Sequence, residues 1–187
     1  MSSALRDEEN FERVIVVGTS CAGKTTFARH MSRSLALPHV ELDELFWNPD
    51  WEPKDEAEFR RLIDTSLARP RWVVDGNYGV ARDLLWPNAD VVIWLNYSFS
   101  TVFFRAICRT ARRVYFRELL FAGNRETLRR SFFSRESILM WVISTFRRRR
   151  KAFTQLRNGN VFPHLKWLEF RSPREARHFL AELDRVR

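Results

Sequence analysis

Residues 18–25 have the types and the spacing that bind phosphate groups. They read G-T-S-C-A-G-K-T, which matches the pattern G-x-x-x-x-G-K-[S/T]. The β-branched run Val14–Val17 precedes them, and a segment typical of a helix follows. Backbone N–H groups in such a loop, together with the positive end of the next helix, attract phosphate oxygens. In this context the pattern predicts a binding site for a nucleoside triphosphate.

Each residue type in this loop suits that chemistry. Lys24 is expected to reach the β- and γ-phosphates, and the Thr25 hydroxyl to ligate Mg²⁺. Cys21 stands at a permissive position, where a small side chain is the simpler interpretation and a redox-sensitive thiol is the alternative. The predicted nucleotide contacts are Gly18, Thr19, Ser20, Cys21, Ala22, Gly23, Lys24, Thr25 and Thr26.

An acid that supports Mg²⁺ is expected at the end of a neighbouring strand. The apolar run Val91–Leu95 ends in Asn96, whereas Trp72–Val74 ends in Asp75, which a glycine follows. A carboxylate at the carboxyl end of a strand lies where a ligand cleft opens in parallel sheets. Asp75 is therefore the predicted metal-side acid; the alternative is that it only begins an Asp-Gly turn.

A second carboxylate, Asp43, follows the expected strand His39–Leu42. There it would accept the proton of an attacking hydroxyl or orient the acceptor. The alternative is an N-cap for the next turn, and the sequence favours neither role. Trp47 and Trp51 nearby would form either an aromatic wall for a flat substrate or part of the packing.

The elements that must position these residues alternate between strand and helix, which predicts an α/β fold with a parallel sheet. Ser172 and Pro173 mark the start of the last helix as its cap and first residue. The expected strands are Val14–Val17, His39–Leu42, Trp72–Val74, Val91–Leu95 and Lys166–Phe170. The expected helices are Lys24–Leu35, Asp55–Ala68, Ser100–Leu156 with breaks, and Pro173–Val186.

The bulk composition narrows the class of protein. The 187 residues are 45% hydrophobic and 14% aromatic, which excludes a disordered chain and suits a single domain. Two cysteines provide no disulfide framework, and no apolar run is long enough to span a membrane. With no apolar signal segment in Met1–Glu12, the expected location is cytoplasmic. The expected organisation is a flexible N-terminus, 1–11, and one domain, 12–187, with 100–156 as a helical lid or insertion.

The net charge of +9 is concentrated in one quarter of the chain. Residues 105–151 hold 14 Lys and Arg against three Asp and Glu, a local charge of +11. Because a phosphate loop lies upstream, a phosphorylated substrate is the favoured partner; nucleic acid and anionic membrane stay open. Within this segment Arg105, Arg109, Arg112 and Arg113 share one helical face. The apolar run Ile138–Phe146 favours a core-packed helix over a membrane-contacting one.

Taken together, these residues resemble the adenylate kinase and shikimate kinase group of P-loop kinases. More closely, 42–47 (L-D-E-L-F-W), 72–78 (W-V-V-D-G-N-Y) and 123–126 (G-N-R-E) resemble the family of DNA topology modulation protein FlaR, also described as adenylate kinase-related proteins. The resemblance implies the three-layer P-loop NTPase fold with strand order 2-3-1-4-5, ATP and Mg²⁺ as cofactors, and a mobile Arg-rich lid.

The resemblance also implies roles for single residues. Asp75 would support Mg²⁺, Asp43 would act on the acceptor side, and Arg60 would hold an anionic group of the acceptor. Arg109 and Arg113, with Arg125 as a further candidate, would be lid arginines that face the transferred phosphoryl group.

The chain departs from both kinase patterns after Gly76. Asn77, Tyr78 and Gly79 stand where adenylate kinases have Phe-Pro-Arg, and Asn77 interrupts the Gly-rich run of shikimate kinases. Neither AMP nor shikimate therefore carries over as acceptor, and Gly76 and Asn77 are predicted only to border it. The sequence predicts a kinase for a nucleotide, nucleoside or small anionic metabolite; the alternative is a nucleotide-regulated DNA-binding protein that affects DNA topology.

Overall fold

The centre of the protein is a five-stranded parallel sheet. The computed structural model describes residues 11–116, 121–123 and 138–186. Its strands pair in the order β2-β3-β1-β4-β5, which confirms the expected fold class and strand order. The strands are β1 (Arg13–Gly18), β2 (His39–Glu41), β3 (Trp72–Asp75), β4 (Val91–Leu95) and β5 (Lys166–Phe170).

The register of the strands brings their polar ends to one edge of the sheet. Glu41 of β2 lies opposite Asp75 of β3, and Asp75 lies opposite Val16 of β1. Gly18, where the phosphate loop begins, lies opposite Leu95 of β4. The carboxyl ends of four strands therefore surround the start of the loop.

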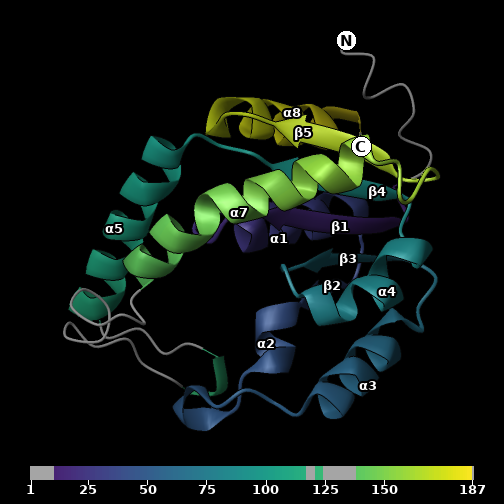
Figure 1. The fold of residues 1–187 in the computed structure, drawn as a ribbon. Helices are drawn as coiled ribbons and strands as arrows, with labels where there is room; N and C mark the ends of the chain where they lie inside the picture. Colours follow the sequence, from purple (N-terminus) through teal and green to yellow (C-terminus); the bar gives the residue numbers. More distant parts are fainter. Residues whose placement is uncertain (1–10, 117–120, 124–137, 187) are drawn as a thin grey trace.

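Helices cover both faces of the sheet (Figure 1). The helices α1 (Lys24–Leu35) and α8 (Pro173–Val186) pack on one face, where Met31 and Phe179 join a buried cluster with Val14 and Ile93. On the other face lie α3 (Glu56–Leu67) and α4 (Arg82–Leu85). The helices therefore bury the hydrophobic strands on both faces, and the loop lies at the edge of this packed core.

The basic segment forms two long helices that pack against each other, α5 (Phe99–Phe116) and α7 (Ile138–Asn158). Figure 1 shows α7 crossing in front of the sheet and α5 at its side. Val102 of α5 and Val142 of α7 are fully buried. Met140, Trp141 and Ile143 of α7 are 45–47% exposed, so the run predicted to be core-packed is buried only in part. A short 3-10 helix, η6 (Phe121–Gly123), contacts α2 and η3.

Several short elements follow the strands and were not predicted. Leu42 begins helix α2 (Leu42–Phe46) rather than ending the second strand, so the predicted strand is one residue too long. The other short elements are 3-10 helices: η3 (Pro49–Trp51), η4 (Gly79–Ala81) and η5 (Trp86–Asn88). They matter because α2 carries Asp43 and because Tyr78, another residue of the candidate site, directly precedes η4.

Parts of the expected organisation fall outside the described residues. These are residues 1–10 of the predicted N-terminal segment, Arg125, and most of the motif 123–126. Phe11, the last residue of that segment, is buried, and its ring lies 6.1 Å from that of Phe179.

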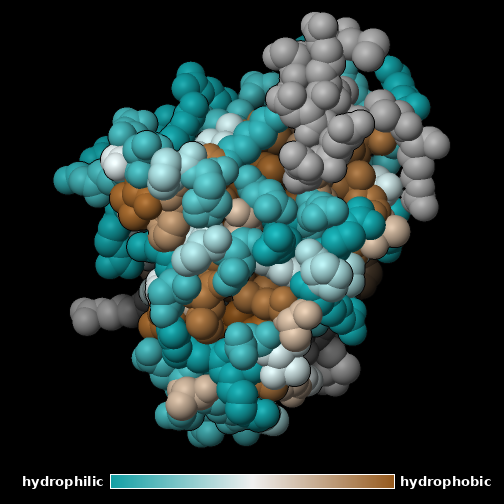
Figure 2. Space-filling view, turned by 90° about the vertical axis from the view of Figure 1, so that its right-hand side faces the viewer, coloured by the Kyte–Doolittle hydropathy of each residue, from teal (hydrophilic) through white to brown (hydrophobic). Residues whose placement is uncertain are grey.

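The surface on the right of Figure 1 faces the viewer in Figure 2. There hydrophobic residues form separate brown areas between hydrophilic ones. Among the helices that the structure describes, none combines the length and the hydrophobicity needed to cross a membrane.

Candidate active site

The phosphate loop leaves β1 through a tightly packed glycine. Gly18 has φ +152°, and a Cβ atom there would lie 2.8 Å from the carbonyl oxygen of Leu95. Cys21 adopts the left-handed region at φ 65° and is buried, as expected for a packed loop position. The loop then enters α1 at Lys24, so the strand–loop–helix context required by the sequence pattern is present.

Arg105 fixes the far side of the loop. Its Nη1 donates a hydrogen bond of 2.7 Å to the carbonyl oxygen of Ala22. Its guanidinium also lies over the ring of Tyr97, 5.7 Å from the centroid. Arg105 therefore belongs to the wall of the nucleotide loop, a role that its helical spacing alone did not identify.

Lys24 lies among charged groups that come from four elements. Burial lowers the pKa of its ammonium group, and the carboxylates of Asp43 and Asp75 act in the opposite direction. Arg149 and Arg109 lower the pKa of Lys24 further. This arrangement joins the loop, two acids and two arginines of the basic helices in one electrostatic cluster.

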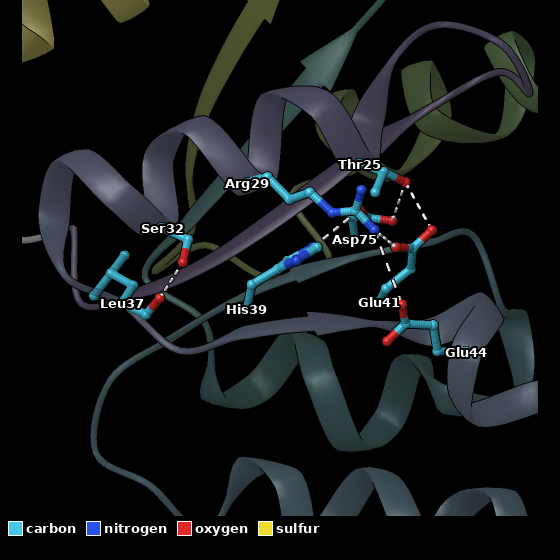
Figure 3. Close-up of polar contacts among 8 residues, drawn as sticks. All are labelled: Thr25, Arg29, Ser32, Leu37, His39, Glu41, Glu44 and Asp75. Atoms are coloured by element: carbon cyan, nitrogen blue, oxygen red, sulfur yellow. Dashed lines mark hydrogen bonds and ion pairs between the residues drawn. The ribbon is translucent and has the colours of Figure 1, made fainter. Parts of the chain in front are cut away.

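Thr25 faces two buried carboxylates (Figure 3). Its Oγ1 lies 3.0 Å from Glu41 Oε1 and 3.3 Å from Asp75 Oδ1. A hydroxyl has one proton, so it donates to one of the two at a time. Glu41 and Asp75 are 5% and 1% exposed, which holds both acids beside the loop. The predicted pair of Thr25 and Asp75 is thus brought together.

Glu41 is a site residue that the sequence analysis missed. Burial raises the pKa of its carboxyl group, and neighbouring Asp75 adds to this effect. Arg29 of α1 binds it at 2.9 Å and lies 3.9 Å from Glu44 (Figure 3). His39 Nε2 lies 3.2 Å from Asp75 Oδ2. Glu41 is the last residue of β2, and this position at a strand end could have identified it. The predicted strand continued to Leu42, so Glu41 did not stand at its end.

The oxygen atoms around Thr25 suit a magnesium ion. Mg²⁺ prefers hard oxygen ligands, and usually takes one or two carboxylates together with phosphate oxygens and water. Thr25, Asp75 and Glu41 offer a hydroxyl and two carboxylates within a few ångströms. Within the described residues, His, Cys, Asp and Glu form no group of three or more that would hold a metal by itself. The donor set therefore fits an ion that shares its coordination with a nucleotide.

Asp43 lies on α2, and its charge acts on Lys24. The hydroxyl of Tyr78 donates a hydrogen bond of 2.6 Å to Asp43 Oδ1. Burial, followed by the charge of Asp43, raises the pKa of Tyr78 well above its ordinary value. The phenol therefore stays protonated and acts as a donor, which leaves Asp43 Oδ2 for another partner.

Arg149 of α7 approaches the same acid. Burial lowers the pKa of Arg149, and Asp43 acts in the opposite direction. Its guanidinium also lies over the ring of Trp141, 5.6 Å from the centroid. Arg149 was not singled out from the sequence, because the sequence does not show which face of this helix turns toward the site.

The two predicted lid arginines both lie on α5. Arg109 acts electrostatically on Lys24, and its buried Nε has no hydrogen-bond partner among the described residues. Arg113 lies one turn further along and is half-buried. The charge of Arg109 therefore acts on the loop lysine, and the lid role of both arginines stays a prediction.

Gly76 and Asn77 lie between the two halves of the site. A Cβ atom on Gly76 would lie 2.7 Å from Leu42 Cβ, so the backbone passes very close to α2. Asn77 holds Gly18 on both sides: its Oδ1 accepts from the Gly18 N–H at 3.3 Å, and its Nδ2 donates to the Gly18 carbonyl at 2.5 Å. Asn77 thus contacts the donor loop, not only the predicted acceptor side.

The predicted acceptor residue Arg60 is engaged elsewhere. It binds both carboxylate oxygens of Asp83, at 2.8 and 2.6 Å, and also the carbonyl of Val80. Trp47 and Trp51 pack edge to face, with ring centroids 5.6 Å apart. Trp47 also contacts Phe46, whose ring packs on Tyr78. The two tryptophans are thus joined to the acceptor side through one aromatic cluster.

The fold matches solved kinases of small molecules. A gluconokinase from Sinorhizobium meliloti aligns with a TM-score of 0.52 and 20% identity, over 94% of this chain and 95% of that one. A shikimate kinase from Acinetobacter baumannii, solved with shikimate, aligns with a TM-score of 0.58 and 14% identity, over 97% and 95%. A shikimate kinase from Bacteroides thetaiotaomicron gives a TM-score of 0.51 and 15% identity, over 94% and 97%.

No protein-family model and no curated protein matches the sequence. The structural matches show that the chain has the fold of P-loop kinases, and the finer resemblance to the FlaR family stays a prediction.

Proposed function

We propose that this protein is a small-molecule kinase that transfers the γ-phosphoryl group of ATP to a hydroxyl group of its acceptor. The observation that carries the proposal is that Lys24 interacts electrostatically with two acids whose hydrogen-bond partners differ. Asp75 belongs to the side of Thr25 and Glu41, whereas Asp43 belongs to the side of Tyr78. This division suits a donor half and an acceptor half that meet at one lysine.

On the donor side, the loop and α1 would bind the phosphates of ATP. Thr25, Asp75 and Glu41 would hold Mg²⁺, which, when bound, neutralises charge on the β- and γ-phosphates. Lys24 and Arg109 bring positive charge to the same place, and the unpartnered Nε of Arg109 suits an anionic ligand. These groups stabilise charge on the transferred phosphoryl group.

On the acceptor side, Asp43 would accept a hydrogen bond from the attacking hydroxyl and take its proton. A carboxylate disfavours a phosphate at this point, because like charges repel. A hydroxyl acceptor is therefore favoured over a nucleoside monophosphate. Arg149 beside Asp43 would attract an anionic group on the acceptor or the transferred phosphoryl group. The named activities of the structural neighbours make sugar acids and cyclic hydroxy acids the first acceptors to test.

The proposal is tested by an acceptor screen that detects ADP. The panel contains gluconate, shikimate, nucleosides and nucleoside monophosphates, each with ATP and Mg²⁺. We expect acceptor-dependent ADP with a hydroxy acid or nucleoside and none with Lys24→Ala. A parent rate of acceptor-dependent ADP formation in Lys24→Ala would refute the site.

A nucleotide-regulated DNA-binding function is the second candidate. It is favoured by the exposed basic residues of α7, namely Arg147, Arg148, Arg150 and Lys151. Binding through DNA phosphates falls steeply with salt, with a slope set by the number of contacts. DNA affinity measured across salt concentrations, with and without ATP, tests it; affinity equal to that for heparin would count against it.

A further inference from the structure

The segment that follows β3 touches both halves of the candidate site with consecutive side chains. Asp75 lies beside Thr25, Asn77 holds the backbone of Gly18, and Tyr78 donates to Asp43. The first two contacts belong to the nucleotide side and the third to the acceptor side. Asn77 and Tyr78, which are joined by one peptide bond, therefore have anchors on opposite sides.

The backbone of this segment has little room to move independently. The N–H of Gly76 donates to the carbonyl of Val16 at 3.4 Å, and its Cα faces Leu42 so closely that no Cβ fits. β1 on one side and α2 on the other therefore confine it. In such packing, a displacement at one end is transmitted rather than absorbed.

The contact of Asn77 fixes the first residue of the loop. An amide side chain that both accepts from and donates to one residue responds to the orientation of that peptide group. Gly18 has little space on the side of β4, since even a Cβ atom on it would lie 2.8 Å from the carbonyl oxygen of Leu95. Bound phosphates attract the N–H groups of the loop and would reorient the peptide groups of Gly18. The two hydrogen bonds between Gly18 and the Asn77 side chain would change with them.

The contact of Tyr78 fixes the acceptor acid. Its ring packs between Phe46 and Phe59, with centroid distances of 4.6 and 5.0 Å. Its hydroxyl donates to only one oxygen of Asp43, so the rotation of that carboxylate depends on where Tyr78 lies. Both residues are positioning residues, because they act through Gly18 and Asp43.

We propose that Asn77 and Tyr78 couple occupancy of the nucleotide loop to the position of the acceptor carboxylate Asp43. The inference rests on the proposed function, since it requires a nucleotide on the loop. Coupling between two sites is reciprocal for binding, and typically changes affinity by about 5- to 150-fold. We therefore expect the affinity for the acceptor to differ between the nucleotide-loaded and the nucleotide-free protein.

The three tyrosines of the chain allow a test that needs no acceptor. The protein is labelled with 3-fluorotyrosine, and the ¹⁹F signals of Tyr78, Tyr97 and Tyr115 are assigned from single Tyr→Phe variants. The probe is Mg²⁺ with the non-hydrolysable analogue AMP-PNP. Tyr97 reports binding because Arg105 joins it to the loop, whereas Tyr115 is 82% exposed and serves as the control.

We expect the signals of Tyr97 and Tyr78 to shift with the same midpoint while that of Tyr115 stays in place. In Asn77→Ala, Tyr97 should still shift and Tyr78 should not. If the Tyr97 signal shifts in the parent and the Tyr78 signal does not, the coupling is wrong but the nucleotide site stands. The same holds if the Tyr78 signal shifts in Asn77→Ala as it does in the parent. If calorimetry detects no binding of AMP-PNP and no signal moves, the proposed nucleotide site fails and the coupling with it.

A second measurement covers the case that Asn77→Ala does not fold. If nucleotide binding has to displace Asp43 through Tyr78, loss of the Tyr78 hydroxyl in Tyr78→Phe should change the affinity for AMP-PNP, although Tyr78 lies on the acceptor side. We expect a change of about fivefold or more, as is typical of coupled sites. Tyr115→Phe is the matched control and should leave that affinity unchanged. Equal affinities in Tyr78→Phe and the parent overturn the proposal.

Discussion

Thr25 Oγ1 lies 3.0 Å from Glu41 Oε1 and so joins the first turn of α1 to the end of β2. Asp75 completes the group from β3, which places two carboxylates beside one hydroxyl of the phosphate loop. Arg29 balances part of this charge at 2.9 Å from Glu41. The proposed donor half is therefore built by three neighbouring elements rather than by the loop alone.

The first prediction concerns Glu41. Glu41→Gln keeps the shape of the side chain but removes a charge from the proposed magnesium site. We expect the Mg²⁺ concentration for half-maximal activity to rise about tenfold or more, as for groups that support a metal. Glu44→Gln is the matched control, since Glu44 is exposed and lies 3.9 Å from the same nitrogen of Arg29. An equal Mg²⁺ requirement in both variants would contradict this role.

The same variant should not unfold the protein. A carboxyl group whose pKa is raised by burial stabilises the fold most at low pH, and this contribution is lost as pH rises through the raised pKa. At neutral pH, Glu41→Gln removes the cost of a buried charge while Gln still hydrogen-bonds. We therefore expect a Tm at pH 7 equal to or above that of the parent, together with lower activity. A clear fall in Tm would mean that the charge stabilises the fold.

The second prediction separates two adjacent arginines. Arg149 is half-buried near Asp43 and Lys24, whereas Arg150 is exposed. Arg149→Gln should lower kcat on the order of a hundredfold, as expected when one group that stabilises transition-state charge is removed. Arg150→Gln should leave kcat within about twofold. Steady-state kinetics with the acceptor from the screen measures both, and equal losses would show a general effect of helix charge.

The third prediction concerns Arg60, whose role as an acceptor anchor is still untested. Its guanidinium is bound by Asp83, so it must leave this partner before it can hold an anionic group. If Arg60 anchors the acceptor, Asp83→Asn should lower the acceptor KM and Arg60→Gln should raise it. The KM for ATP serves as the internal control. An unchanged acceptor KM in both variants would remove Arg60 from the site.

The fourth prediction concerns the acid stability that Glu169 of β5 provides. Burial acts to raise the pKa of Glu169, but hydrogen bonds from Asn96, Arg171 and Arg157 outweigh it and lower the pKa. A lowered pKa means that ionised Glu169 stabilises the fold, and that this stability is lost as pH falls below about 4.5. In Glu169→Gln, the free energy of unfolding should therefore fall less steeply than in the parent as the pH decreases through that range. Denaturant titrations at several pH values measure this, with exposed Glu52→Gln as the control.

The sequence predicted the parts of this account that depend on local pattern. The loop Gly18–Thr25 and the β-branched strands follow from residue type and spacing, and the sheet has the strand order that the family resemblance implies. Asp75 was found because it ends an apolar run. These features need no knowledge of which segments pack together.

The residues that were missed act across long distances in the chain. Glu41 reaches Thr25, 16 positions away, and Tyr78 reaches Asp43, 35 positions away. Arg149 reaches the site only because α7 packs on α5 and crosses the sheet. Such roles depend on tertiary packing and on which face of a helix turns inward. Neither can be derived from the local spacing of residues in the sequence.

The central claim is phosphoryl transfer to a hydroxyl acceptor, and its most direct test is mass spectrometry of the acceptor after incubation with ATP and Mg²⁺. We expect the parent to form a phosphorylated hydroxyl compound in a one-to-one ratio with ADP. Lys24→Ala should form neither. ADP without any phosphorylated acceptor across the panel would contradict the claim and leave an ATP-hydrolysing or ATP-binding protein.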